Sequence, residues 1–291
     1  GGGPPDGPEA KAVDEGVAEG PGEDPVVASA FAEAKVRGFQ EPGLAATAKH
    51  FAAYGASAAG RDYASVDISA RSLAEVYLPP FRAAVEAGAL ALMPAFTDLA
   101  GVPLTADRAL LTDTLRGDWG FDGVVISDYN AVAELMRHGV AADMAEAAAL
   151  ALRAGVDIDM MSGAYRDGLP VALGRGLVTM AEVDTAVHRV LALKARLGLF
   201  ADPFRRARPA SPTPPPRALA REAAARGLTL LTNRGETLPI ETPPASLALL
   251  GPLADAPADM LGPWAGTGRA EEAVTLLSAL RRAWPETGIA H

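Results

Sequence analysis

A carboxylate stands directly after a short apolar run near the middle of this 291-residue chain. The run VVI at residues 124–126 is followed by Ser127 and Asp128, and a helical pattern begins at residue 131. A β-branched run that ends in polar residues is typical of a buried parallel strand. In a strand–loop–helix unit, barrel enzymes carry their reactive groups at the carboxyl end of the strand. Asp128 is therefore a candidate catalytic residue, although aspartate is equally favoured as a helix N-cap.

Basic side chains stand at the end of another predicted strand, at residues 45–50, and in the loop that follows it. Lys49 and His50 stand at its tip, and Arg61 lies in the Gly- and Ser-rich loop that follows. If the strands are neighbours, these groups surround Asp128 and favour its ionised form, which can attack an electrophilic carbon. Such donors also suit the hydroxyls of a sugar. Two other interpretations stay open: a polar cluster at a rim, and a Schiff base on Lys49.

These side chains must be positioned by alternating strands and helices. Apolar periodicity predicts helices at 25–39, 69–87 (broken at the prolines 79–80), 107–116, 143–154 and 180–197, and strands at 45–50, 89–96, 124–126 and 155–161. Strand–helix alternation predicts a parallel sheet with right-handed crossovers in an α/β fold. The polar strand ends favour a barrel over an open sheet.

Composition divides the chain into four parts. Residues 1–24 are rich in Gly, Pro and acidic residues and are expected to be a disordered tail. Residues 25–201 form the strand–helix domain, and 202–217 form a Pro-rich linker. Residues 218–291 predict a second α/β domain, with strands at 228–231 and 247–251 and a helix near 271–284. That domain is shorter than the roughly 100–150 residues of most domains, so we expect it to be cut short.

Charge and residue types exclude several classes of function. The net charge of −10 disfavours nucleic-acid partners and acidic membrane surfaces. No apolar run approaches the roughly 18 residues of a membrane span. The absence of cysteine excludes disulfides and thiolate chemistry, and the four histidines lack metal-ligand spacing, which disfavours a zinc site. No secretion signal is recognisable in residues 1–16.

Six ordered segments together resemble glycoside hydrolase family 3, and most closely its bacterial β-glucosidase branch. They are GEDP (from residue 22), AATAKHFAAYGA, GRDY, VDISARSLAEVYLPPFRAAVEAG, TADRALLTDTLRGDWGFDGVVISDYNAV and AGVDIDMM. The resemblance covers residues 22–263. It implies a partial (β/α) TIM-type barrel at 25–201, followed by the start of an α/β sandwich domain at 218–291, with the active site between the two.

The resemblance also implies a role for each matching residue. Asp128, in the SDY motif, would be the nucleophile of a retaining mechanism, which pairs it with an acid/base carboxyl roughly 5–5.5 Å away. Phe96 stands where the family often has Tyr, and Tyr129 where many members have Trp. The implied sugar-binding residues are Lys49, His50, Arg61, Phe96 and Tyr129.

The chain departs from the family pattern at both ends. The family barrel begins well before GEDP, and no match precedes Gly22. The acid/base Glu of the family lies deep in the sandwich domain, apparently beyond His291. A half barrel leaves two open sheet edges, which proteins normally close or cover. We therefore expect a fragment of a longer product, with very weak turnover by itself.

The favoured function is a retaining, exo-acting β-glucosidase that releases terminal β-D-glucosyl residues from oligosaccharides or aryl β-glycosides. The alternatives are a β-xylosidase of the same family and an inert sugar-binding fragment, with the Schiff-base enzyme less favoured. The loop after KHF holds no His, which argues against the N-acetylglucosaminide branch. Family resemblance implies a periplasmic or secreted location, and it implies no metal and no organic cofactor. The sequence leaves homo-oligomer formation open.

Two further acids alternate on the predicted strand at 155–161. Asp157 and Asp159 should face the same side of that strand. They could shape the pocket, but strand acids more often bond loop amides or helix N-termini, and we favour that structural role. His138 and His188 lie in predicted helices, where a structural role is expected.

Overall fold

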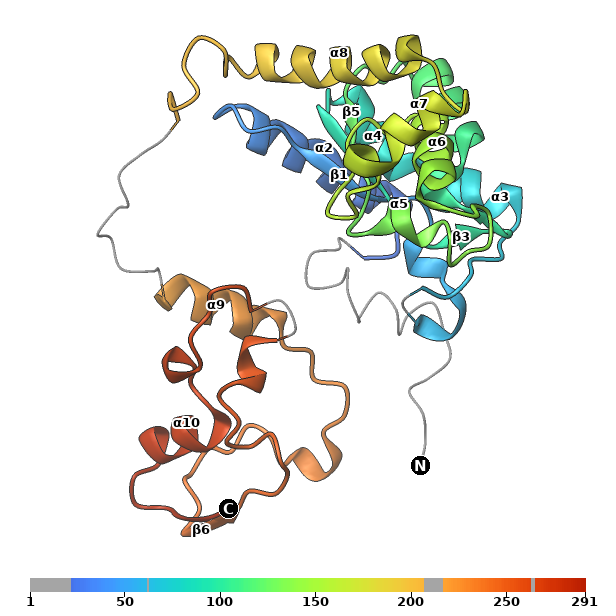
Figure 1. The fold of residues 1–291 in the computed structure, drawn as a ribbon. Helices are drawn as coiled ribbons and strands as arrows, with labels where there is room; N and C mark the ends of the chain where they lie inside the picture. The colour runs from blue at the N-terminus through green and yellow to red at the C-terminus, as the bar shows by residue number, and fades with distance from the viewer. Residues whose placement is uncertain (1–21, 62, 207–216, 263–264) are drawn as a thin grey trace. The chain divides into compact units, whose positions relative to one another are not determined.

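The computed structural model describes residues 22–61, 63–206, 217–262 and 265–291 (Figure 1). The chain divides into two compact units, Gly1–Ala210 and Ser211–His291. The predicted tail falls mostly on residues 1–21 and the predicted linker mostly on residues 207–216, which lie outside the described residues. Their boundaries therefore stay predictions.

A small parallel sheet lies at the centre of the first unit. Its strands are β1 (Thr47–Phe51), β2 (Ala91–Pro94) and β5 (Val124–Val125), in the order β1-β2-β5. Both pairs are parallel, as strand–helix alternation predicts. Among the described residues this sheet is not closed, so the α/β class is established while the barrel stays a prediction.

The predicted strand at 155–161 is wrong as a full strand. Only one parallel bridge forms there, between Ile126 and Ile158. The next residue but one, Met160, instead donates its N–H to Ser127 Oγ (2.8 Å), and its carbonyl accepts from Asn130 N (2.9 Å). The segment therefore bonds to the loop that follows β5, which ends the ladder after one residue.

Helices pack around this sheet (Figure 1). Helix α2 (Pro25–Gln40) begins at Asp24, whose carboxylate accepts from the first amides, and it packs against α4 (Pro79–Glu86). The predicted helix at 69–87 consists of α3 (Ala70–Ser72), the π-helical η3 (Leu73–Tyr77) and α4. The break before Pro79 is confirmed, because proline lacks the N–H that would continue the helix.

The other helices of the first unit match the predicted pattern in place, although not always in length. Helix α6 (Met144–Ala154) starts at the N-cap Asp143 and ends at Gly155, and α8 (Met180–Arg196) starts with a capping box between Thr179 and Glu182. The further helical segments are η1 (Tyr54–Ala56), η2 (Ala58–Gly60), η4 (Leu104–Ala106), η5 (Ala109–Asp118), α5 (Ala131–Glu134), η6 (Ala164–Gly168) and α7 (Leu169–Gly174).

The core of the first unit joins the sheet to α6 and its neighbours. Phe51 at the end of β1 is fully buried and meets Phe81 and Trp119 edge to face, at ring centroid distances of 5.2 and 5.9 Å. Other fully buried members include Leu92, Leu111, Leu115, Val125, Val132, Leu135 and Val156. This packing holds the strands whose carboxyl ends carry the candidate residues.

A short antiparallel pair follows β2. It consists of β3 (Asp98–Leu99) and β4 (Val102–Pro103). Leu99 also forms a parallel bridge with the fully buried Val66. This bridge ties the loop after β1 to the loop after β2.

The described residues of the second unit, 217–262 and 265–291, contain one parallel strand pair and two longer helices. Strand β6 (Ser246–Ala248) pairs with β7 (Gly288–Ala290), and the helices are α9 (Arg217–Gly227) and α10 (Leu276–Ala283). Short segments η7 (Arg234–Glu236), η8 (Asp259–Leu261) and η9 (Ala270–Glu272) complete it. The predicted strand at 228–231 is wrong, because its leucines are exposed and the segment pairs with no described strand.

No helix among the described residues is long and apolar enough to span a membrane.

Candidate active site

Asp128 lies two residues beyond Ile126, at the carboxyl end of the β5 segment. Asp128 is 8% exposed, and its Oδ1 accepts a hydrogen bond from Tyr129 N at 2.7 Å. Its Oδ2 is buried and accepts no hydrogen bond from any described residue. The N-cap position of α5 belongs to Asn130, whose φ of 59° turns the chain into the helix. Asp128 therefore does not cap that helix.

His50 reaches Asp128 across the intervening strand β2. Its Nε2 lies 3.5 Å from Asp128 Oδ2, and both side chains are largely buried. The structure thus brings together two of the residues that sequence analysis selected. Lys49 and Arg61 are both exposed to solvent, so their predicted contacts with a sugar stay predictions.

Aromatic side chains continue from His50 along the loops. The His50 ring meets Tyr54 edge to face at 5.1 Å, and Tyr54 meets Phe96 in the same way at 5.2 Å. Tyr63 stacks on Phe96 at 4.2 Å, with 21° between the ring planes. Tyr129, beside Asp128, is 60% exposed. Sequence analysis missed Tyr54 and Tyr63, although both lie in the loop that follows the KH pair.

His138 contacts the backbone of Phe96, a member of this aromatic group. Its Nε2 lies 3.3 Å from the Phe96 carbonyl oxygen, with the donor set by the ring tautomer. The contact links the helical turn after α5 to the end of β2. This agrees with the structural role expected for His138.

Asp157 is buried to the same extent as Asp128 but is fully bonded. Its carboxylate accepts from Arg116 Nη2 (2.6 Å), Arg189 Nη1 (2.9 Å) and Val125 N (2.9 Å). Burial raises the pKa of Asp157 above its usual value and lowers the pKa of Arg116, while their mutual attraction opposes both shifts. The side chain joins η5, β5 and α8, so it takes the structural role that we favoured.

Asp159 also bonds locally. Its carboxylate accepts from Ser162 Oγ (2.5 Å) and from Tyr165 N (3.3 Å). It thereby shapes the turn between Ile158 and η6. Neither predicted strand acid reaches Asp128.

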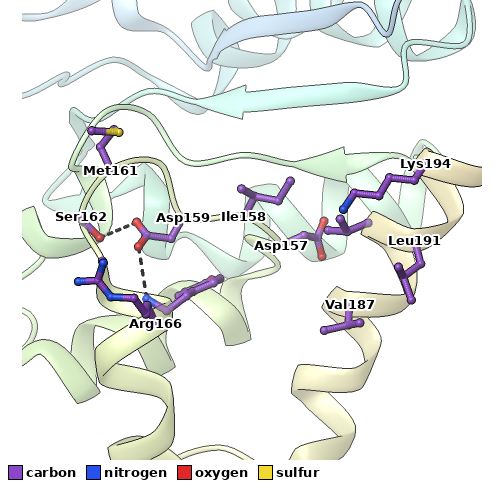
Figure 2. A pocket seen from close by; sticks show the side chains of 12 residues that line it. Asp157, Ile158, Asp159, Met161, Ser162, Arg166, Val187, Leu191 and Lys194 are labelled. Atoms are coloured by element: carbon purple, nitrogen blue, oxygen red, sulfur yellow. Dashed lines mark hydrogen bonds between the residues drawn. The ribbon is translucent and has the colours of Figure 1, made fainter. Parts of the chain in front are cut away.

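A cavity of about 680 Å³ lies beside these two acids and not at Asp128. Figure 2 shows Met161, Ser162 and Arg166 on one wall and Val187, Leu191 and Lys194 of α8 on the other. The Asp157 carboxylate at this cavity is occupied by two arginines and an amide. The cavity therefore lacks a carboxylate that is available for reaction, and Asp128 remains the candidate.

Comparison with known proteins connects this arrangement to a family. The model of the glycosyl hydrolase family 3 N terminal domain matches residues 12–193. A periplasmic beta-glucosidase of Salmonella typhimurium is 41% identical over 279 residues, which cover 91% of this chain and 36% of the relative. A beta-xylosidase of Formosa agariphila is 38% identical over 257 residues, which cover 81% of this chain and 36% of the relative.

Solved structures give the same result. The crystal structure of a beta-glucosidase from Listeria innocua in complex with glucose matches with a TM-score of 0.82 and 39% sequence identity. The match covers 94% of this chain and 39% of that protein, so this chain spans less than half the length of the proteins it matches. The family match begins at residue 12, so the expectation that no match precedes Gly22 is wrong. The resemblance itself is confirmed: the chain belongs to glycosyl hydrolase family 3.

Proposed function

We propose that this chain supplies the nucleophile and part of the sugar site of a retaining, exo-acting β-glucosidase. The observation that carries the proposal is Asp128, which is buried at a strand end with Oδ2 free of hydrogen bonds from described residues and 3.5 Å from His50 Nε2. An oriented carboxylate with unused lone pairs is what nucleophilic attack requires. The names of the Salmonella and Listeria relatives support glucose as the sugar.

In the proposed first step, Asp128 Oδ2 attacks the anomeric carbon of the terminal sugar. The bond between that carbon and the glycosidic oxygen breaks, and its electron pair leaves with that oxygen, which takes a proton from a second carboxyl group. Water then cleaves the glycosyl–Asp128 ester and restores the carboxylate. His50 would orient the carboxylate or a neighbouring sugar hydroxyl, while Lys49, Arg61, Phe96 and Tyr129 would hold and line the sugar. The family resemblance implies a Glu of the sandwich domain as this second carboxyl group.

A β-xylosidase is the second candidate, because the Formosa relative carries that name. Xylose lacks the hydroxymethyl group of glucose, so the two activities differ in one small part of the sugar site. An inert sugar-binding chain is the third candidate. Schiff-base chemistry at Lys49 is disfavoured, because activated lysines are desolvated and Lys49 is exposed.

We further propose a periplasmic or secreted location, supported by the name of the Salmonella relative. The proposed substrates are oligosaccharides or aryl β-glycosides. A linkage preference is not part of this proposal.

The test uses a substrate whose leaving group departs without help from an acid catalyst. The chain is incubated with 2,4-dinitrophenyl 2-deoxy-2-fluoro-β-D-glucoside, whose leaving group departs without a proton and whose fluorine slows hydrolysis of the ester. We expect a glycosylated peptide that contains Asp128, identified by mass spectrometry. The corresponding xyloside separates the two sugar specificities. Glucose binding without labelling would instead support the inert sugar-binding chain.

A further inference from the structure

Ser127 is fully buried directly before the candidate nucleophile, and the mechanism proposed above assigns no role to its side chain. Its Oγ accepts a hydrogen bond from Met160 N at 2.8 Å and donates one to the backbone carbonyl oxygen of Asp128 at 3.0 Å. A hydroxyl can accept and donate at the same time, which an apolar side chain of similar size cannot do. The hydroxyl of Ser127 therefore joins the backbone of Asp128 to a segment some thirty residues further along the chain.

The turn that carries the candidate nucleophile is held at both ends by that same segment. Before the turn, Ser127 N donates to Ile158 O at 2.8 Å, and after it Asn130 N donates to Met160 O at 2.9 Å. The two residues 128–129 lie between these anchors. Because the anchors are only two residues apart on one segment, they restrict movement of the turn as a whole. The orientation of the peptide group inside the turn is then set by what bonds to it.

One peptide group connects the Ser127 hydroxyl to the Asp128 carboxylate. The peptide between Asp128 and Tyr129 is a planar unit, so its C=O and its N–H turn together. Its C=O accepts from Ser127 Oγ (3.0 Å) and from Ala131 N (3.2 Å), and its N–H donates to Asp128 Oδ1 (2.7 Å). The hydroxyl thus helps to fix one end of a rigid unit whose other end holds the carboxylate.

The orientation of the carboxylate decides which oxygen faces a substrate. While the amide of Tyr129 holds Asp128 Oδ1, Oδ2 lies 3.5 Å from His50 Nε2 and accepts no hydrogen bond from a described residue. Reaction depends on alignment of the attacking atom, and a displacement of about 1 Å can cost about 100-fold in rate. A buried residue that fixes the carboxylate can therefore act on the rate without touching the substrate.

We propose that Ser127 is a positioning residue, whose hydroxyl fixes the peptide group at 128–129 and through it directs Asp128 Oδ2 toward the anomeric carbon. The inference rests on the proposed glycosidase function and deepens it by naming the group that sets the reactive geometry. Because Ser127 is fully buried, its hydroxyl acts on the step in which the bond to Asp128 forms and not on binding of the sugar.

The test follows labelling of the chain by 2,4-dinitrophenyl 2-deoxy-2-fluoro-β-D-glucoside at increasing reagent concentration. This separates the affinity for the reagent from the labelling rate constant at saturation. For Ser127→Ala we expect the rate constant to fall about 10- to 100-fold while the affinity stays within about twofold of the parent value. Ser127→Thr should recover most of the lost rate, because it keeps a hydroxyl at the same position.

Thr112→Val is the matched control, because it removes another hydroxyl that donates to a backbone carbonyl, that of Ala154 (2.7 Å), between η5 and α6. Ser127→Ala and Thr112→Val should both lower the urea midpoint, and only Ser127→Ala should slow labelling.

Three results would overturn the inference: Ser127→Ala labelled at the parent rate, both variants slowed equally, or a folded Ser127→Thr chain as slow as Ser127→Ala. In each of these cases the parent chain is labelled, so the inference fails while the proposed function stands. If the parent chain itself is not labelled, the proposed function fails and the inference fails with it.

Discussion

Two aspartates on neighbouring segments of this protein are equally buried and differently bonded. Asp128 and Asp157 flank the bridge between Ile126 and Ile158, and they are 8% and 7% exposed. Asp157 bonds two arginines and a backbone amide through both of its oxygens. Asp128 bonds one backbone amide through Oδ1, and its Oδ2 accepts no hydrogen bond from a described residue.

The difference separates structure from reactivity. A buried carboxylate is costly unless donors satisfy it, so Asp157 follows the ordinary rule for a protein interior. Asp128 departs from that rule at a strand end beside His50. Departures of this kind are expected at functional sites, because hydrogen bonds from donors lower the nucleophilicity of a carboxylate oxygen. Both side chains are buried, with 11% and 0% of their surface exposed, so the hydrogen-bond donors distinguish the two residues more clearly than burial does.

The largest expected effect comes from Asp128→Asn. The rate of covalent labelling by the fluorinated glucoside should fall at least about a thousandfold, since the amide is a poor nucleophile. The free energy of unfolding should change by less than about 1 kcal/mol, because only one hydrogen bond is at stake. Mass spectrometry and urea unfolding measure the two quantities. Undiminished labelling of the variant would remove Asp128 from the mechanism.

In contrast to Asp128→Asn, Asp157→Asn should act mainly on the free energy of unfolding. We expect the free energy of unfolding to fall by about 3–5 kcal/mol, because Arg116 would be left buried without its carboxylate partner. Urea unfolding measures the loss. The double variant Asp157→Asn with Arg116→Met should recover part of it, since it removes the uncompensated charge. A single variant as stable as the parent chain would show that this ion-pair group is dispensable.

His50→Ala tests the neighbour of the nucleophile. His50 Nε2 lies 3.5 Å from Asp128 Oδ2 and would orient it, and misplacement of a reacting group can cost about 100-fold, so labelling should slow by about 10- to 100-fold. His188→Ala, at an exposed position on α8, is the matched control and should label at the parent rate. Equal rates for the two variants would mean that His50 does not act on Asp128.

The smallest effect concerns a third aspartate, at the surface. A hydrogen bond from Arg196 lowers the pKa of Asp122, and both side chains are about half exposed or more. A lowered carboxyl pKa adds stability above the usual value near 4, and that stability is lost as the pH falls through the folded-state pKa. Arg196→Gln should therefore cost at most about 0.5 kcal/mol at pH 7 and less at pH 2.

Urea midpoints at the two pH values measure this difference. Adding Asp122→Asn to the Arg196 variant should have little further effect at pH 7. A cost that is the same at both pH values would show that Arg196 stabilises the chain by packing and not through Asp122.

Local patterns predicted much of the first unit. The apolar run at 124–126 marks β5, the proline pair marks the break before α4, and Asp143 and Thr179 are typical N-caps at the starts of α6 and α8. These features depend on residues that are close in the sequence. The strand expected at 155–161 failed because Met160 bonds to the loop after β5, a contact between distant residues.

In the second unit, too, local sequence patterns did not predict pairing between distant segments. Strand β7 was not predicted, because three residues near the end of the chain carry too little pattern, and it pairs with β6 some forty residues away. The leucines at 228–231 have the pattern of a strand but no described strand pairs with them. A strand is stable only with a partner, which local periodicity cannot supply.

By itself, the sequence determined the family, the parallel α/β character of the first unit and the choice of Asp128 and His50, because these rest on motifs and on apolar periodicity. Only the tertiary structure decided that Asp128 Oδ2 accepts no hydrogen bond from a described residue while Asp157 is held by two arginines, and that Tyr63 stacks on Phe96. The physical reason is that a side chain's role depends on the donors and rings that surround it, and most of these come from residues far along the chain.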